Sequence, residues 1–230
     1  MSWSGLGDWW RDQLATDPAY EEVVTPLLLE VLQPRPGALY ADIGCGEGRV
    51  MRTLRSLRAE VVGIEISPDL AARAGPGSVI AESPSLPLRD DSVDGIYLVL
   101  VLEHLLDLRP LFTEAARVVS EVGVMAVVMN HPVWTAPGST SITDSDGEVL
   151  WRPGAYFSDG VSDLPAGETT VSFHHRSIAT LLSAAAGAGW CLEQMIERPH
   201  HDLPGQEGIP RLLACRWRLL PLASVPTAED

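Results

Sequence analysis

LYADIGCGEGR, at residues 39–49, determines how the rest of this 230-residue chain is organised. It predicts a buried strand that runs into a glycine-rich turn, followed by a helix that begins near Val50. Glycines alternate at positions 44, 46 and 48, and glycine tolerates positive φ and lets another group approach the backbone closely. The helix N-terminus beyond them offers unpaired N–H groups and a partial positive charge. The segment therefore predicts a turn that binds a small molecule with a carboxylate or other negatively charged group.

The spacing of this turn bears on which small molecule it binds. A dinucleotide site requires G-x-G-x-x-G, and Arg49 stands where the third glycine should be. Asp42 comes two residues before the first glycine, where a carboxylate would repel a pyrophosphate but attract an ammonium or a sulfonium. The pattern therefore argues against a nicotinamide dinucleotide.

Two more acids follow predicted strands. Glu65 ends the strand at 60–65, where a carboxylate can hold a ribose diol by two hydrogen bonds. Glu82, followed by Ser83, ends the strand at 78–82 and can accept from an adenine amino group. Since the carboxyl ends of parallel strands meet at one edge of a sheet, we expect these acids and Asp42 to share one crevice.

The ordered motifs of residues 20–131 resemble those of class I S-adenosylmethionine-dependent methyltransferases, in particular the small-molecule type 11 group related to the ubiquinone and menaquinone biosynthesis enzymes. The motifs that carry the resemblance are residues 42–49, GIEIS at 63–67, Glu82-Ser83 with Leu86-Pro87, Asp94, Leu102-Glu103-His104 and Arg117-Val118-Val119. Two positions differ: Glu82 stands where the family usually has Asp, and Glu121-Val122-Gly123 replaces a Pro-Gly-Gly turn.

The resemblance implies S-adenosylmethionine as cofactor, S-adenosylhomocysteine as product, and methyl transfer by direct displacement. It implies that Asp42 holds the methionine amino end, Glu65 the ribose hydroxyls, and Glu82 with Ser83 the adenine edge. The full set of expected cofactor-binding residues is Asp42, Gly44, Cys45, Gly46, Glu65, Ile66, Glu82, Ser83 and Leu98.

Alternating strands and helices predict an α/β fold with a mostly parallel sheet and right-handed crossovers. We predict strands near 38–43, 60–65, 78–82, 94–100, 122–130, 190–197 and 211–219, and helices near 48–57, 68–73, 110–119 and 177–188. The resemblance implies a Rossmann-like three-layer sandwich with seven strands in the order 3-2-1-4-5-7-6, the last-paired strand antiparallel.

We predict a single methyltransferase domain over 1–230. Residues 1–34 are expected to form an N-terminal helical cap over the cofactor cleft, as the resemblance implies, or a helix whose tryptophans only pack it onto the sheet. Asp17 is the expected helix cap before Pro18, and an apolar stripe follows. Residues 132–173 are rich in Gly, Pro, Ser, Thr and Asp, with one hairpin around Ser145-Asp146-Gly147, and are expected to be a lid over the acceptor pocket or a mobile surface insertion. Residues 221–230 are expected to be disordered.

The composition excludes several classes of partner. A net charge of −15 argues against nucleic acid and against an anionic membrane surface, because both bind through Lys and Arg. No apolar run is long enough to span a membrane, and the N-terminus lacks the pattern of a signal peptide, so a cytoplasmic protein is expected. The three cysteines, and the pairs His174-His175 and His200-His201, lack metal-ligand spacing, so no metal is expected.

A general base is needed only where the methyl acceptor carries a proton. His131, which follows the fifth strand, and His104, which follows the fourth, are the candidates, although either could be a structural or surface histidine. An uncharged or cationic small-molecule acceptor is expected, while methylation at oxygen, nitrogen or carbon stays open, as does the oligomeric state. The competing functions are an NAD-dependent oxidoreductase on a related fold and a non-catalytic cofactor-binding scaffold.

Overall fold

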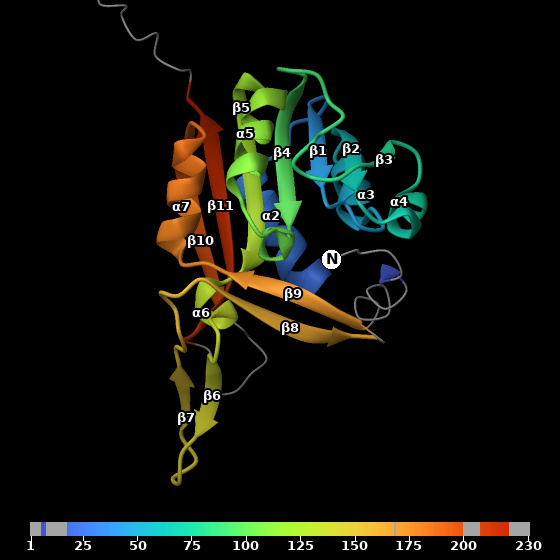
Figure 1. Ribbon diagram of the computed structural model, residues 1–230. Coiled ribbons are helices and arrows are strands. Elements are labelled where there is room, and N and C mark those ends of the chain that lie inside the picture. The colour runs from blue at the N-terminus through green and yellow to red at the C-terminus, as the bar shows by residue number, and fades with distance from the viewer. Residues whose placement is uncertain (1–5, 8–17, 168, 200–207, 221–230) are drawn as a thin grey trace, which may run out of the picture.

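The computed structural model describes residues 6–7, 18–167, 169–199 and 208–220. A seven-stranded sheet forms its centre, in the order β10-β11-β5-β4-β1-β2-β3 (Figure 1). Strands β1 to β5 pair in parallel, whereas β11 is antiparallel to both β5 and β10. Since β10 and β11 are the sixth and seventh strands of this sheet along the chain, the predicted fold class and strand order 3-2-1-4-5-7-6 are confirmed.

The elements that build this sheet and its helical layers have the following bounds. The strands are β1 (Leu39–Ile43), β2 (Glu60–Glu65), β3 (Ser78–Ile80), β4 (Val93–Val99), β5 (Val119–Asn130), β10 (Trp190–Pro199) and β11 (Pro210–Leu219). The helices are η1 (Tyr20–Val24), α2 (Thr25–Leu32), α3 (Arg49–Ser56), α4 (Pro68–Ala74), η2 (Leu102–His104), α5 (Arg109–Val118), α6 (Pro132–Thr135) and α7 (Ile178–Gly187).

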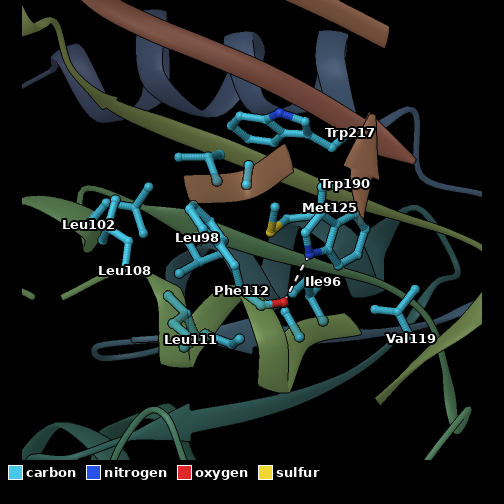
Figure 2. Packing of buried hydrophobic residues seen from close by; sticks show 14 of the residues in the cluster. Ile96, Leu98, Leu102, Leu108, Leu111, Phe112, Val119, Met125, Trp190 and Trp217 are labelled. Carbon is cyan, nitrogen blue, oxygen red and sulfur yellow. Dashed lines mark hydrogen bonds between the residues drawn. The ribbon is translucent and has the colours of Figure 1, made fainter. Parts of the chain in front are cut away.

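Each face of the sheet buries its own apolar cluster. Helices α2 and α3 cover one face, where Tyr40, Tyr97 and Met51 are buried. Helices α5 and α7 cover the other, where Phe112 of α5 packs against Trp217 of β11 (Figure 2). The indole Nε1 of Trp190 donates to the backbone oxygen of Phe112 at 2.9 Å, so the one polar atom of that buried ring is satisfied. This three-layer packing holds the carboxyl ends of β1, β2 and β4 in fixed register.

The N-terminal helix differs from its prediction in geometry. It begins as a π-helical turn at Tyr20–Val24 and becomes α-helical at Thr25, whose N–H bonds the oxygen of Tyr20. Pro26 lacks the N–H that an α-helix would direct to Glu22, which favours the wider turn here. The predicted cap Asp17 lies outside the described residues.

The chain between α6 and α7 forms two hairpins, of which the sequence predicted one. The predicted hairpin pairs β6 (Thr140–Thr143) with β7 (Val149–Arg152) and projects away from the sheet (Figure 1). The second pairs β8 (Gly160–Ala166) with β9 (Thr169–His175) and crosses beneath the carboxyl ends of β1 and β4 (Figure 1). Within the described ranges, no helix is both long and apolar enough to cross a lipid bilayer.

Candidate active site

A cavity of about 610 Å³ opens at the carboxyl ends of the parallel strands. The glycine turn after β1, the end of β2 and the loop after β3 form one side of it. The segment after β4, which includes η2, and strand β9 form the other. Of the expected cofactor-binding residues, eight line this cavity: Asp42, Gly44, Cys45, Gly46, Glu65, Ile66, Glu82 and Ser83.

The glycine turn is shaped by close packing at Gly44 and by open space at Gly46. Gly44 has a φ of 74°, and a Cβ there would lie 2.5 Å from Cγ2 of Val101. A Cβ at Gly46 would meet nothing within 4 Å, so the backbone of Gly46 is accessible from the cavity. The adjacent Cys45 thiol has its pKa raised, mainly by burial, and therefore stays protonated.

Asp42 is a buried acid with an unsatisfied oxygen. Asp42 is 3% exposed, and its buried Oδ2 atom makes no hydrogen bond among the described residues. Burial is the main cause that raises the pKa of Asp42 to about 8; the Tyr97 hydroxyl offsets part of the rise, and the Glu65 carboxylate adds to it. A cationic group entering the cavity would supply the missing partner and favour the ionised carboxylate.

Glu65 connects the end of β2 to the glycine turn. Its Oε2 accepts from the Gly46 N–H at 2.9 Å, and its Oε1 accepts from the Ser67 N–H at 2.8 Å. The pKa of Glu65 is raised, mainly because the side chain is buried, while these N–H groups partly oppose the rise. Each carboxylate oxygen keeps a second lone pair, so the same group can also accept from two hydroxyls of a ribose.

Glu82 and Ser83 lie in the loop after β3, because that strand ends at Ile80, earlier than predicted. Both line the cavity, and the Ser83 Oγ atom is buried without a partner among the described residues. Ile66 also lines the cavity and is 37% exposed, which leaves an apolar surface for a planar ring.

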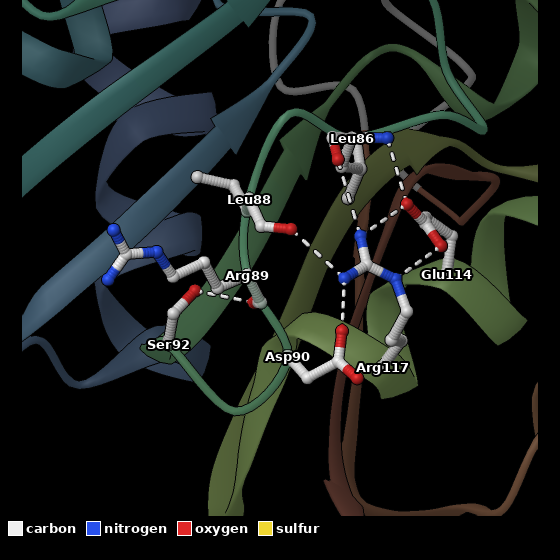
Figure 3. A network of polar contacts seen from close by, with 7 residues as sticks. All are labelled: Leu86, Leu88, Arg89, Asp90, Ser92, Glu114 and Arg117. Carbon is white, nitrogen blue, oxygen red and sulfur yellow. Dashed lines mark hydrogen bonds and ion pairs between the residues drawn. The ribbon is translucent and has the colours of Figure 1, made fainter.

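Arg117 of α5 fixes the loop that carries Glu82 and Ser83 (Figure 3). Its guanidinium donates to the backbone oxygens of Leu86 and Leu88 at 3.3 and 3.0 Å. It also donates to Glu114 at 2.9 Å, and Glu114 in turn accepts from the Leu86 N–H at 2.9 Å. The sequence contained both Leu86 and Arg117 as motif residues, and the structure shows that they contact each other.

Leu98 does not line the cavity, so its predicted position in the site was wrong. Its side chain is fully buried in the apolar cluster beneath α5 and α7. The cavity wall begins one residue later, with Val99, Leu100 and Val101. Because both faces of β4 are apolar, the sequence did not indicate which of its last residues faces the crevice.

His131 also lies outside the cavity, and the prediction that it faces the cleft was wrong. It caps α6: its Nδ1 accepts from the Val133 N–H at 3.1 Å, and its Nε2 lies 2.7 Å from Oε1 of Glu197 on β10. Its pKa is lowered, mainly by burial, although Glu197 opposes the shift. Through these contacts His131 connects the start of α6 to β10.

His104 does line the cavity, at the end of η2. Its Nδ1 lies 3.1 Å from the backbone oxygen of Ser172 on β9, and its ring meets Phe173 edge-on with centroids 4.8 Å apart. The buried Glu103 next to it accepts from the backbone and side-chain N–H groups of Asn130, both at 2.7 Å. The position of His104 therefore depends on β5 and on the β8–β9 hairpin.

Sequence reasoning missed the cavity residues of β9. Thr170, Ser172 and His174 line the cavity and alternate along the strand, so they share one face. The alternation of polar residues in TVSFHH was the available signal. The described residues contain no cluster of three or more His, Cys, Asp or Glu side chains placed to share a metal ion.

The site fits an adenosyl amino acid. The unsatisfied Asp42 Oδ2 suits an ammonium, and Glu65 suits a ribose diol. The unpartnered Ser83 Oγ and the exposed surface of Ile66 suit an adenine ring. All four groups line one cavity.

Comparison with known proteins agrees with this geometry. Residues 41–127 match the family model described as a methyltransferase domain, which agrees with the resemblance to class I S-adenosylmethionine-dependent methyltransferases of type 11. S-adenosylmethionine is the cofactor of that class.

An O-methyltransferase from Penicillium expansum is 31% identical over 147 residues, which are 56% of this chain and 53% of that protein. An uncharacterized methyltransferase from Mycobacterium bovis is 33% identical over 112 residues, 46% of this chain and 43% of that protein. The chain thus spans about half the length of these relatives. The crystal structure of an S-adenosylmethionine-dependent methyltransferase from Mesorhizobium loti shares the fold, with a TM-score of 0.74, 24% identity, and coverage of 89% of this chain and 99% of that one.

Proposed function

We propose that this protein transfers the methyl group of S-adenosylmethionine to a small-molecule acceptor. The observation that carries the proposal is the buried, unpartnered Oδ2 of Asp42, which lines the same cavity as Glu65. A buried carboxylate without a partner is costly, and the ammonium of the methionine moiety would satisfy it. When bound, the cofactor supplies an electrophilic methyl group on a positively charged sulfur.

On the cofactor side, we assign one role to each group. Asp42 accepts from the amino group, and the accessible backbone at Gly46 admits the methionine end. Glu65 accepts from the ribose hydroxyls while its bonds to Gly46 and Ser67 hold it in place. Glu82 and Ser83 bind the adenine edge. The chain's part in catalysis is then to hold the acceptor in line with the sulfur–methyl bond and to exclude water.

On the acceptor side, two segments close the cavity. Strand β9 contributes Thr170, Ser172 and His174, whereas the β6–β7 hairpin projects away from the sheet (Figure 1). This supports a lid made of residues 160–175, a narrower segment than the 132–173 expected from the sequence. Leu6 and Tyr20 also line the cavity, which supports the N-terminal cap at 1–34.

A small-molecule acceptor is favoured by this enclosure and by the similarity to a protein named as an O-methyltransferase. His104 is the candidate general base because it lines the cavity, whereas His131 does not. An NAD-dependent oxidoreductase has no support, since the Asp42 carboxylate stands where a pyrophosphate would approach.

Titration calorimetry with S-adenosylhomocysteine tests the proposal. We expect the protein to bind S-adenosylhomocysteine and not NAD, and Glu65→Gln to weaken binding at least tenfold, about 1.4 kcal/mol. The matched control is Glu60→Gln, which changes the exposed acid at the opposite end of the same strand. Binding of NAD in preference, or equal effects of the two substitutions, would contradict the assignment.

A further inference from the structure

Tyr97 of β4 is a buried residue beside Asp42 to which the proposed function gives no role. The residue is fully buried, and its hydroxyl oxygen makes no hydrogen bond among the described residues. Buried hydroxyls without a partner are uncommon, because they lose their hydrogen bonds to water and gain none in return. Resting on the proposed function, we propose that Tyr97 is a positioning residue for the methyl donor: its hydroxyl donates to the Asp42 carboxylate when the ammonium of the donor binds there.

The sheet places the two side chains next to each other. Asp42 of β1 and Tyr97 of β4 are register partners in a parallel pair of strands. Tyr40 and Tyr97 both belong to the apolar cluster beneath α2 and α3, so the alternation of side chains along β1 puts Asp42 on that same face. Asp42 lines the cavity and Tyr97 does not, so Tyr97 can act on a ligand only through Asp42.

Three other titratable groups act electrostatically on this pair: Glu65, Cys45 and Arg55. Glu65 accepts from two backbone N–H groups, and the Cys45 thiol stays protonated. Arg55 of α3 donates to two backbone oxygens, at 2.9 and 3.0 Å. Among the described residues, the Tyr97 hydroxyl is therefore the donor beside Asp42 that has no other hydrogen bond.

The hydroxyl favours one charge state of Asp42. A hydrogen bond from a hydroxyl to a carboxylate is roughly twice as strong as one between neutral groups. Accordingly, Tyr97 lowers the pKa of Asp42 and offsets part of the rise that burial causes. The pKa of Tyr97 itself is raised, mainly by burial and further by Asp42, so the hydroxyl keeps its hydrogen. When the ammonium binds, Asp42 loses its proton to solvent, and the carboxylate accepts from both the ammonium and Tyr97.

Tyr97 should thereby set the pH range over which the donor binds. Below the Asp42 pKa of about 8, binding includes the cost of ionising this acid. Removing the hydroxyl raises that pKa further, so binding weakens at pH 7. Well above the pKa, Asp42 is already ionised and the loss should disappear. A contact that only stabilises the fold would change binding equally at both pH values.

The test compares Tyr97→Phe with Tyr40→Phe, since each removes one buried hydroxyl. The Tyr40 hydroxyl differs in that it accepts from the Arg35 N–H at 3.0 Å. In titration calorimetry with S-adenosylhomocysteine, Tyr97→Phe should weaken binding about tenfold at pH 7 and about twofold at pH 9, as a shift of about one pKa unit gives. Its Tm at pH 7 should equal or exceed that of the parent, because the hydroxyl has no hydrogen bond to lose. Tyr40→Phe should lower Tm and keep the affinity within about twofold at both pH values.

A double-mutant cycle with Asp42→Asn tests whether the hydroxyl acts through this carboxylate. In the Asp42→Asn background, Tyr97→Phe should change S-adenosylhomocysteine affinity by less than about twofold. Four results would each overturn the inference: unchanged affinity of Tyr97→Phe at pH 7, equal weakening at pH 7 and pH 9, equal weakening in the parent and in Asp42→Asn, or a Tm below that of the parent. Failure of the parent protein to bind S-adenosylhomocysteine would instead overturn the proposed function, and this inference with it.

Discussion

Replacing Asp42 with asparagine should stabilise the protein while weakening its binding of S-adenosylhomocysteine. The carboxylate is buried, its Oδ2 has no partner among the described residues, and its pKa is raised to about 8. At pH 7 the folded protein therefore keeps Asp42 protonated, whereas the unfolded chain ionises it. Asparagine has nearly the same shape and titrates in neither state, so the substitution removes this difference.

The size of the effect follows from the pKa shift. The pKa of Asp42 is 3.8 in the unfolded chain, and only the interval from that value to pH 7, roughly 3 pH units, affects stability at pH 7. This interval corresponds to a loss of about 4 kcal/mol in the free energy of unfolding at most. Because the folded pKa of an acid is raised here, stability falls as pH rises from about 4 to about 8. The new amide must find its own hydrogen bonds, at a cost of about 1–3 kcal/mol, so we expect a net gain of about 1–3 kcal/mol. For a domain of this size, that is a rise in Tm of roughly 2–10 °C.

Binding should change in the opposite direction. A charge-assisted hydrogen bond contributes about 1.5–3 kcal/mol, so its loss should weaken S-adenosylhomocysteine binding by roughly ten- to a hundredfold. In the parent protein the ammonium favours ionised Asp42, so binding at pH 7 should release a proton.

Calorimetry in buffers of different ionisation enthalpy measures that proton, and thermal unfolding between pH 5 and 8 measures the stability. We expect Asp42→Asn to lose both the proton release and the decline in Tm with pH, whereas Glu60→Gln keeps both. An asparagine variant that is less stable than the parent at pH 7, or that binds S-adenosylhomocysteine equally well, would refute the reasoning.

Three further predictions test the positions of other residues. His131→Leu removes the cap of α6 and the partner of Glu197, and should lower the free energy of unfolding in urea by about 1–3 kcal/mol without changing kcat. Because the pKa of His131 is lowered in the folded protein, the parent should also lose stability as the pH falls below the unfolded pKa of 6.5. The variant should not show this pH dependence. Arg176 donates to the backbone oxygens of Leu102 and His174 and so anchors the end of β9 to η2. Arg176→Lys should therefore speed amide hydrogen exchange across residues 160–175 while leaving S-adenosylhomocysteine affinity within about twofold; unchanged exchange would contradict the anchoring role. Gly44→Ala should weaken S-adenosylhomocysteine binding and lower Tm, because its Cβ would lie 2.5 Å from a Val101 methyl at a φ of 74°, and an unchanged Tm would count against this close approach.

The gathering of Asp42, Glu65 and Glu82 at one cavity was predictable because their signals are local. Each acid follows its own strand within a few residues, and the glycines lie in the turn that needs them. The bond from Gly46 to Glu65 joins neighbouring parallel strands, a contact that the strand order already implies. The positions of the acids therefore follow from local sequence signals, whereas the strand order follows from the resemblance to the methyltransferase family.

The errors fell where a side chain's direction depends on distant parts of the chain. Leu98 and Val99 are both apolar and both buried, so hydrophobicity alone did not separate the core residue from the one at the cavity. His131 turns away from the crevice because Glu197, 66 residues later, binds its ring. Nothing near His131 in the sequence indicated that partner.

The acceptor side of the cavity depends on contacts between residues far apart in the sequence, unlike the side with the glycine turn. The contact between His104 and Ser172 spans 68 residues, and that between Arg176 and Leu102 spans 74. The glycine turn and Glu65 instead bond each other and the ends of β1 and β2, and Gly44 packs against Val101. We therefore expect the hairpin's sequence to influence the choice of acceptor and the strand ends to influence the choice of methyl donor. The two properties should then respond to separate substitutions.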